Sequence, residues 1–221
     1  MAGIDFSRLT ASIERLGREH NRPPLDEATV GQDPFELFGE WMEEALEAGI
    51  DLPNAMTLAT ADSKGVPSAR MVLLKSFDEE GFVFFSNYQS RKGRDLEQNP
   101  NAALVFYWSP LERQVCVAGP VERLDRERSI EYFESRPVGS RLGAWVSRQS
   151  SVIGSREELE AAVREAEQQF SGRNVPLPPS WGGYLLRPER IEFWQSRPNR
   201  LHDRFHFTRT ESGWRRDRLS P

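Results

Sequence analysis

The chain has 221 residues, of which 38% are hydrophobic and 29% are charged, and its formal net charge is -5. This composition is typical of a globular domain and excludes an intrinsically disordered chain. The acidic balance argues against nucleic acid as a partner, and no run approaches the roughly 20 apolar residues of a membrane span.

The sequence also limits the compartment and the kind of chemistry. The N-terminus lacks the charged start and apolar run of a secretory signal, and Cys116 is the only cysteine, so no internal disulfide can form. We therefore expect a cytoplasmic protein in which Cys116 packs as a small hydrophobic residue. The sequence has no Cys/His cluster, Walker loop or G-x-G-x-x-G motif, so we expect no metal site.

The predicted helices begin after a polar segment. Residues 1–32 show little periodicity and predict a mobile N-terminal arm, with a short helix near residues 7–19. Asp33 and Pro34 are typical of a helix start, and Gly49 of its end. The residues that this helix places on one face are Phe35, Phe38, Trp41, Met42, Ala45 and Leu46. Further helices are expected over residues 90–98, 126–135 and 155–170, the last with a capping box formed by Ser155 and Glu158.

The rest of the sequence predicts β-strands. The expected strands are residues 55–61, 68–77, 82–87, 102–108, 113–124, 181–187, 190–195, 204–208 and 214–218. Short strands with tight turns and few helices favour a mainly β, α+β fold built on a closed or partly open antiparallel barrel. We see no internal repeat and no long linker, so residues 33–221 are expected to form a single domain.

Two segments predict phosphate binding. Arg70 and Lys75 lie at the two ends of an otherwise apolar strand. Ser90 can cap a helix whose first turn holds Arg91 and Lys92, and basic residues there oppose the helix dipole unless an anion is bound. Taken singly, each segment also fits ordinary solvated surface charge.

Two later segments extend this pattern. Tyr132 and Arg136 lie four residues apart on a predicted helix and share a face, and Ser140 follows in a turn. They can clamp a phosphate, although a Tyr–Arg stacking pair is the alternative. Trp194 fits a core position or a cofactor wall, and residues 200–204 hold three basic or imidazole side chains around an aspartate. The set suits a ligand that is aromatic at one end and phosphorylated at the other.

The order of these runs carries a resemblance. The runs are residues 70–75, 85–93, 111–115, 132–140, 145–151 and 191–195 with 200–205. Together they resemble the pyridoxamine 5'-phosphate oxidase family over residues 33–221, and six runs in order are far more specific than any one of them. The resemblance implies an FMN-binding split β-barrel that works as a homodimer, with FMN between the subunits.

The resemblance also implies roles for individual residues. The FMN-binding residues would be Arg70, Met71, Val72, Leu73, Leu74, Lys75, Phe85, Ser86, Arg91, Lys92, Gln114, Gln149, Ser150, Trp194 and Arg204. The substrate-binding residues would be Lys75, Tyr132, Arg136, Ser140, Arg200, Leu201 and His202, with Arg200 and His202 as the catalytic pair.

The implied reaction is the oxidation of pyridoxamine or pyridoxine 5'-phosphate by O2 to pyridoxal 5'-phosphate, with H2O2 and, from the amine, NH3 as by-products. We expect hydride transfer from C4' to flavin N5, with Arg204 stabilising the anionic reduced flavin. The family arm covers the substrate with a cation and a tyrosine, and here Arg18 and His20 correspond to them. Phe85 stands where a tyrosine is common in the family.

Three alternatives remain open at this point. The chain fits a flavin oxidase of phenazine synthesis on the same barrel, a non-catalytic protein that stores or senses FMN or pyridoxal phosphate, or a reductase that uses a deazaflavin cofactor. The runs at residues 132–140 and 200–202 favour the oxidase of the vitamin B6 pathway, because their side chains fit a phosphorylated pyridine.

Overall fold

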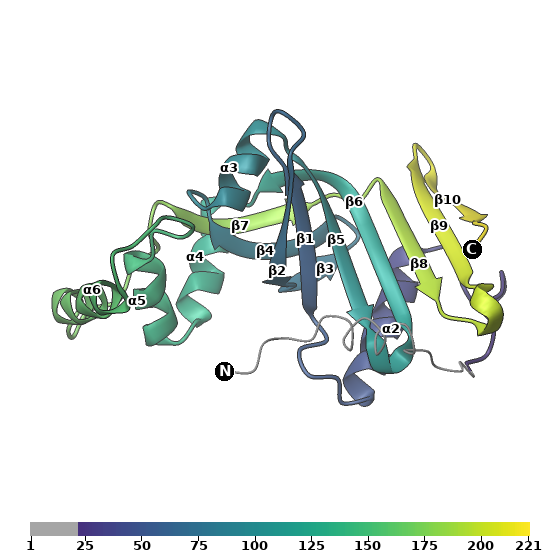
Figure 1. Cartoon of the computed structure of the whole chain (residues 1–221), viewed down its shortest axis with the longest axis horizontal. Helices are drawn as coiled ribbons and strands as arrows, with labels where there is room; N and C mark the ends of the chain where they lie inside the picture. The colour runs from purple at the N-terminus through teal and green to yellow at the C-terminus, as the bar shows by residue number, and fades with distance from the viewer. Residues whose placement is uncertain (1–21) are drawn as a thin grey trace, which may run out of the picture.

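A curled antiparallel sheet forms the centre of the computed structural model, which describes residues 22–221 (Figure 1). Its strands are β1 (Ala55–Ala61), β2 (Pro67–Leu73), β3 (Ser76–Asp78), β4 (Gly81–Asn87), β5 (Asn101–Trp108), β6 (Arg113–Arg123), β7 (Trp181–Leu186), β8 (Arg190–Gln195), β9 (Asp203–Thr210) and β10 (Gly213–Arg218). The main path of the sheet is β10-β9-β8-β6-β5-β1-β2, and β7, β4 and β3 branch from β6. The expected antiparallel, mainly β fold with flanking helices is confirmed.

The sheet divides at β6. Residues 113–118 of this strand pair with β8, whereas residues 121–123 pair with β7. Gly119 lies between the two stretches, and a Cβ atom added to it would stand 2.0 Å from the carbonyl oxygen of Arg187. Glycine is therefore required at position 119, because the backbone near Arg187 approaches it closely. The division directs β8, β9 and β10 to one end of the molecule and β4 and β7 to the other.

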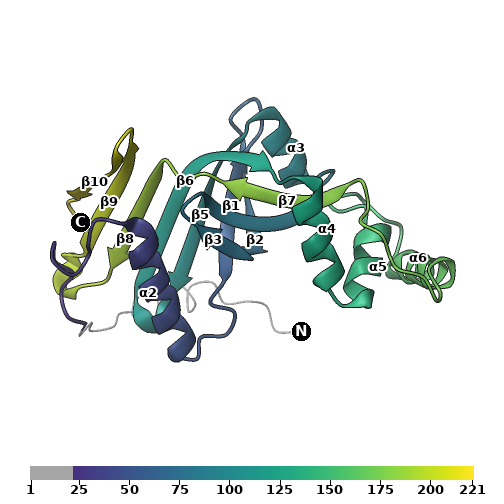
Figure 2. The same ribbon diagram turned by 180° about the vertical axis from the view of Figure 1, so that it is seen from behind.

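Five helices flank the sheet within the described residues: α2 (Pro34–Glu47), α3 (Arg91–Gln98), α4 (Arg126–Ser135), α5 (Val138–Val146) and α6 (Arg156–Gln169). Helix α2 covers one face of the sheet, and α4, α5 and α6 gather at the end away from β9 and β10 (Figures 1 and 2). In Figure 1 the opposite face of β5, β6 and β8 faces the viewer and carries no helix from residues 22–221. None of the described helices is long and apolar enough to cross a membrane.

Helix α2 begins as the sequence predicts, because the side chain of Asp33 accepts a hydrogen bond of 2.8 Å from the Phe35 amide. Its Phe38 ring packs edge-on against Phe82 and Phe106, and its Trp41 packs against Phe193. These contacts form the centre of the main hydrophobic core. A second, smaller core lies among α4, α5 and α6; its buried members are Phe133, Leu142, Ala144, Ala166, Val175, Leu177 and Trp181.

The predicted strand 68–77 is two strands, and the prediction of one was wrong. The Leu74 amide donates to the Asn54 carbonyl, at 2.9 Å, and the Lys75 amide donates to the Val83 carbonyl on β4, at 2.8 Å. The chain therefore changes partner from β1 to β4 between Leu73 and Ser76. Apolar residues continue through this change, so hydrophobicity alone does not show it.

Two helix predictions also need correction. Helix α5 was missed, because the sequence Pro137-Val138-Gly139-Ser140 has the composition of a turn, and Ser140 lies in the first turn of this helix. On α2, Leu46 is 60% exposed, whereas Leu37, which the periodicity leaves out, is buried. The α2 surface that contacts the core is therefore centred closer to Leu37 than predicted.

The described part of the predicted arm is packed against the C-terminal strands. Leu25 and Val30 are buried in the main core. The Gln195 side chain donates to the Pro23 carbonyl, at 2.8 Å. Packed structure therefore begins before the predicted boundary at residue 32. The short helix expected near residues 7–19, and the candidates Arg18 and His20, lie outside the described residues.

Gly93 in α3 provides a test of the packing beside the cavity described below. A Cβ atom on Gly93 would stand 2.1 Å from the carbonyl oxygen of Tyr88, whereas one on Gly143 in α5 has no described atom within 4 Å. Gly93→Ala should lower the free energy of unfolding by about 1–3 kcal/mol, because backbone atoms must shift. Gly143→Ala should raise it by up to about 1 kcal/mol through helix propensity. Urea unfolding of both variants checks this, and equal effects would contradict the packing described here.

Candidate active site

One cavity collects most of the predicted site. It has a volume of about 490 Å³ and lies among β2, β4, α3, α4 and α5. The predicted residues that line it are Met71, Val72, Leu73, Lys75, Phe85, Ser86, Lys92, Tyr132, Arg136, Ser140 and Gln149. Pro137 and Trp181 also line it and were not predicted as site residues. A volume of this size is typical of a small-molecule site.

Lys92 is the electrostatic centre of this cavity. Its side chain is buried, and its Nζ donates to the Gln149 Oε1 atom at 2.7 Å. Burial, followed by the nearby positive charge of Arg70, lowers the pKa of Lys92 to about 8. No carboxylate within residues 22–221 forms an ion pair with it. A buried cation without a counter-charge is costly, and an anionic ligand would stabilise it.

The start of helix α3 brings together the polar residues around Lys92. Ser90 caps the helix, since its Oγ accepts from the Gly93 amide at 3.3 Å. The Arg91 amide donates to the Ser150 Oγ, at 3.2 Å. Gln149 Oε1 also accepts from the buried Ser86 Oγ, at 3.4 Å. The segments at residues 86–92 and 149–150, far apart in the sequence, thus meet at one helix N-terminus, where the helix dipole favours an anion.

Aromatic rings and a second, half-buried cation form the opposite wall. Phe85 stacks on Tyr132 with ring centroids 3.9 Å apart and on Trp181 at 5.3 Å. The Arg136 guanidinium lies 4.6 Å from the Trp181 ring. Its Nη1 atom is buried and forms no hydrogen bond within the described residues, and burial lowers the pKa of Arg136. The cavity therefore offers an unsatisfied donor beside flat apolar surfaces.

Two further predicted residues lie beside the cavity without lining it. Arg70 donates to the Thr60 Oγ1 at 2.7 Å, and that hydroxyl donates to Asp95 at 2.6 Å. Burial lowers the pKa of Arg70, and Asp95 partly offsets this. Arg70 thus connects β1 and β2 to α3. The side chain of Leu74 is buried in the main core.

The remaining predicted residues form a second group on β6, β8 and β9 and in the loop between the last two. They are Gln114, Trp194, Arg200, Leu201, His202 and Arg204. The rings of Trp194 and His202 lie 4.7 Å apart. The His202 Nδ1 atom accepts from the Arg197 amide at 3.2 Å, which fixes the proton of a neutral ring on Nε2.

Arg204 is held by an acidic neighbour. Its Nε and Nη2 atoms both lie 2.8 Å from the Glu192 Oε1 atom. This hydrogen bond raises the pKa of Arg204. On the same sheet face Cys116 is half-buried, and its pKa is raised to about 11, first by burial and then by Glu192. The thiol therefore stays protonated near neutral pH.

One copy of the chain does not unite the two groups. Strands β6, β5 and β1 lie between β8 and β2. At the usual spacing of neighbouring strands, β8 and β2 are about 19 Å apart along the sheet. Lys75 and Tyr132 belong to one end, and Arg200 and His202 to the other. The two groups therefore lie on parts of the sheet that are several strands apart.

The comparisons with known proteins agree with this fold. Residues 42–170 match the family described as "Pyridoxamine 5'-phosphate oxidase". Residues 181–221 match the "Pyridoxine 5'-phosphate oxidase C-terminal dimerisation region". The chain is similar to a "Pyridoxine/pyridoxamine 5'-phosphate oxidase" of Rubrobacter xylanophilus, with 59% identity over 93% of this chain and 95% of the relative. The protein of the same name from Burkholderia mallei is 56% identical over 95% of this chain and 99% of the relative.

Solved structures show the same architecture. PhzG from Burkholderia lata, in complex with tetrahydrophenazine-1-carboxylic acid, aligns with a TM-score of 0.84 and 30% identity over 90% of this chain and 98% of that chain. A "pyridoxamine 5'-phosphate oxidase-related, FMN binding protein" from Nostoc punctiforme aligns with a TM-score of 0.68 and 17% identity. The alignment covers 86% of this chain and 100% of that chain. The second likeness shows the fold alone.

The protein is a split-barrel flavoprotein, an oxidoreductase with FMN as its cofactor. The chain belongs to the pyridoxamine 5'-phosphate oxidase family. Trp181 was the main residue missed among the cavity walls. It stands in the sequence Trp181-Gly182-Gly183, which the resemblance includes, but a tryptophan at the start of an apolar strand has the same pattern as a core residue.

Proposed function

We propose that the protein oxidises pyridoxamine 5'-phosphate or pyridoxine 5'-phosphate with O2 to pyridoxal 5'-phosphate. The observation that carries the proposal is a pair of cations in one cavity, the buried Lys92 and the half-buried Arg136, without a carboxylate partner among the described residues. Two cations suit two phosphates, one on the cofactor and one on the substrate. The curated relatives named above support the same substrates.

The residues of the cavity fit FMN and substrate at different places. Arg91 and Lys92, at the start of α3, and Ser86, near the end of β4, would hold the cofactor phosphate. Lys75, Tyr132, Arg136 and Ser140 would hold the substrate phosphate. FMN, when bound, supplies the acceptor for the two electrons that leave the substrate and passes them to O2.

The second group would complete the site from another copy of the chain. Arg200 and His202 follow β8, which is four strand spacings, or about 19 Å along the sheet, from β2, so we propose a homodimer with FMN at the interface between subunits. His202 would donate a hydrogen bond from Nε2, because its Nδ1 accepts from the Arg197 amide. The face of β5, β6 and β8 that carries no described helix is available for this contact.

A second candidate function is the oxidation of a phenazine precursor, which the similarity to PhzG favours. The ligand named with that structure is a carboxylic acid. A phosphate with its double charge and three oxygens makes fuller use of Lys75, Arg136, Tyr132 and Ser140 than one carboxylate does. We therefore favour the phosphorylated pyridine.

The direct test is an aerobic assay of the FMN-loaded protein with pyridoxamine 5'-phosphate, in which aldehyde and H2O2 are measured together. We expect both products in equal amounts, and little oxidation of unphosphorylated pyridoxamine because Arg136 and Lys75 then have no anion to bind. Turnover of tetrahydrophenazine-1-carboxylic acid without turnover of the phosphate would favour the second candidate. If the protein binds FMN but forms no product from either compound, both candidate functions are contradicted.

Lys92 predicts how FMN affinity depends on pH. In the FMN-free protein Lys92 loses its proton near pH 8, because its pKa is lowered to about 8, while a bound phosphate favours the charged form. FMN binding above this pH therefore takes up a proton, and the affinity should fall by up to about tenfold per pH unit above about pH 8.

The control for this prediction is Lys64, an exposed lysine in the turn after β1. Lys92→Met should weaken FMN binding near pH 7 and abolish the decline above pH 8, whereas Lys64→Met should keep the wild-type profile. Flavin fluorescence titrations at several pH values measure both. An unchanged pH profile in Lys92→Met would show that Lys92 does not contact the cofactor phosphate.

A further inference from the structure

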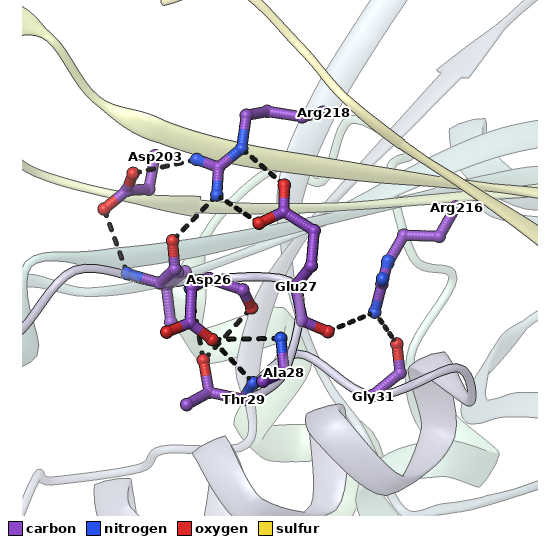
Figure 3. A network of polar contacts seen from close by, with 9 residues as sticks. Asp26, Glu27, Ala28, Thr29, Gly31, Asp203, Arg216 and Arg218 are labelled. Carbon is purple, nitrogen blue, oxygen red and sulfur yellow. Dashed lines mark hydrogen bonds and ion pairs between the residues drawn. The ribbon is translucent and has the colours of Figure 1, made fainter.

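Asp203 lies between the two proposed substrate residues Arg200 and His202 and the proposed FMN residue Arg204. Its side chain is only 13% exposed. It accepts from the Arg218 Nη1 atom on β10 at 3.1 Å and from the Leu25 amide, also at 3.1 Å. The Arg197 Nε atom lies 3.5 Å away. This carboxylate therefore connects β9 to β10 and to the segment at residue 25, which is far away in the sequence (Figure 3).

The loop that Asp203 ends has an unusual backbone. Asn199 and Arg200 both adopt left-handed conformations, with φ angles of 58° and 61°. Residues other than glycine seldom adopt this conformation unless the surrounding structure holds them in it. The Arg197 amide also donates to the His202 ring, so the loop is closed on itself at its two ends. Contacts outside the loop are needed to keep this arrangement.

The segment at residues 22–27 supplies those contacts. The Arg197 side chain donates to the Arg22 carbonyl. Arg218 donates to the Leu25 carbonyl at 3.0 Å and to both carboxylate oxygens of Glu27, at 2.9 and 3.2 Å. Figure 3 shows Arg218 between Asp203 and Glu27, with all of its guanidinium nitrogens in use. Planar, multidentate contacts of this kind fix orientation as well as distance.

We infer that Asp203 is a positioning residue for substrate binding, held by Arg218 and by residues 22–27. It acts through the loop at residues 197–202, because it fixes the end of the loop from which Arg200 and His202 reach the substrate. This inference rests on the proposed function, which assigns those two residues to the substrate. It adds a role for a carboxylate that makes no contact with the cavity of its own chain.

The test compares Asp203→Asn with Asp217→Asn in the full-length, FMN-loaded protein. Asp217 lies on β10 and forms an exposed ion pair with Arg215 at 2.9 Å, so its loss alters a similar contact away from Asp203. Asp203→Asn should raise KM for pyridoxamine 5'-phosphate about tenfold, as expected when a charged hydrogen-bond acceptor is lost. The FMN dissociation constant and kcat should change less than about twofold. Asp217→Asn should leave all three unchanged.

Hydrogen exchange gives a readout that does not depend on activity. The amides of residues 197–202 should exchange about tenfold faster in Asp203→Asn and at the wild-type rate in Asp217→Asn. A wild-type protein without oxidase activity would contradict the proposed function, and the exchange rates would then decide the inference by themselves. An active wild type with equal KM and equal exchange in both variants would overturn the inference alone.

A second variant covers the case in which Asp203→Asn does not fold. Glu27→Gln leaves Asp203 in place and weakens one side of the Arg218 contact. It should raise KM about threefold and speed exchange of residues 197–202 to an intermediate extent, because a neutral oxygen accepts a weaker hydrogen bond. A folded Glu27→Gln protein with the wild-type KM and the wild-type exchange rates at residues 197–202 would overturn the role assigned to residues 22–27.

Discussion

The division of the sheet at β6 determines where every part of the proposed site lies. One strand pairs with β8 along its first half and with β7 near its end, and Gly119 allows the close approach between them. As a result, the cavity beside β4 and the loop before β9 stand at opposite ends of the molecule. Each end alone holds only some of the groups that the proposed reaction needs. The proposed shared site is consistent with the family's C-terminal dimerisation region.

The charges of the cavity indicate which kind of ligand it binds. Lys92 is buried and Arg136 is half-buried, both have lowered pKa values, and neither has a carboxylate partner within residues 22–221. On β8 and β9, by contrast, Arg204 and Arg197 are matched by Glu192 and Asp203. Unmatched cations favour an anionic ligand, whereas matched ones hold a fixed geometry. In the proposed function, the two parts of the site thus have different roles: one would bind phosphate and the other would hold side chains in a fixed orientation.

Much of the fold and of the cavity is predictable from the sequence, because strands, caps and basic helix starts have local signals. Ser90 with Arg91 and Lys92 indicates an anion site from the residue pattern alone, and the fold brings Ser86 and Gln149 to the same place. Helix α5 and the break after Leu73 are not predictable in this way, since both depend on contacts with distant strands. The packing of residues 22–32 depends on Asp203 and Arg218, which lie almost the whole sequence away.

In the proposed homodimer, each active site combines the cavity of one chain with the loop at residues 197–202 of the other. Co-expression of Arg136→Ala and Arg200→Ala chains carrying different tags tests it, because only a mixed dimer restores one intact site. Each variant alone should be nearly inactive, and a random mixture should recover about a quarter of wild-type activity. Mixed dimers that copurify by both tags yet show no activity above the single variants would contradict a site shared between chains.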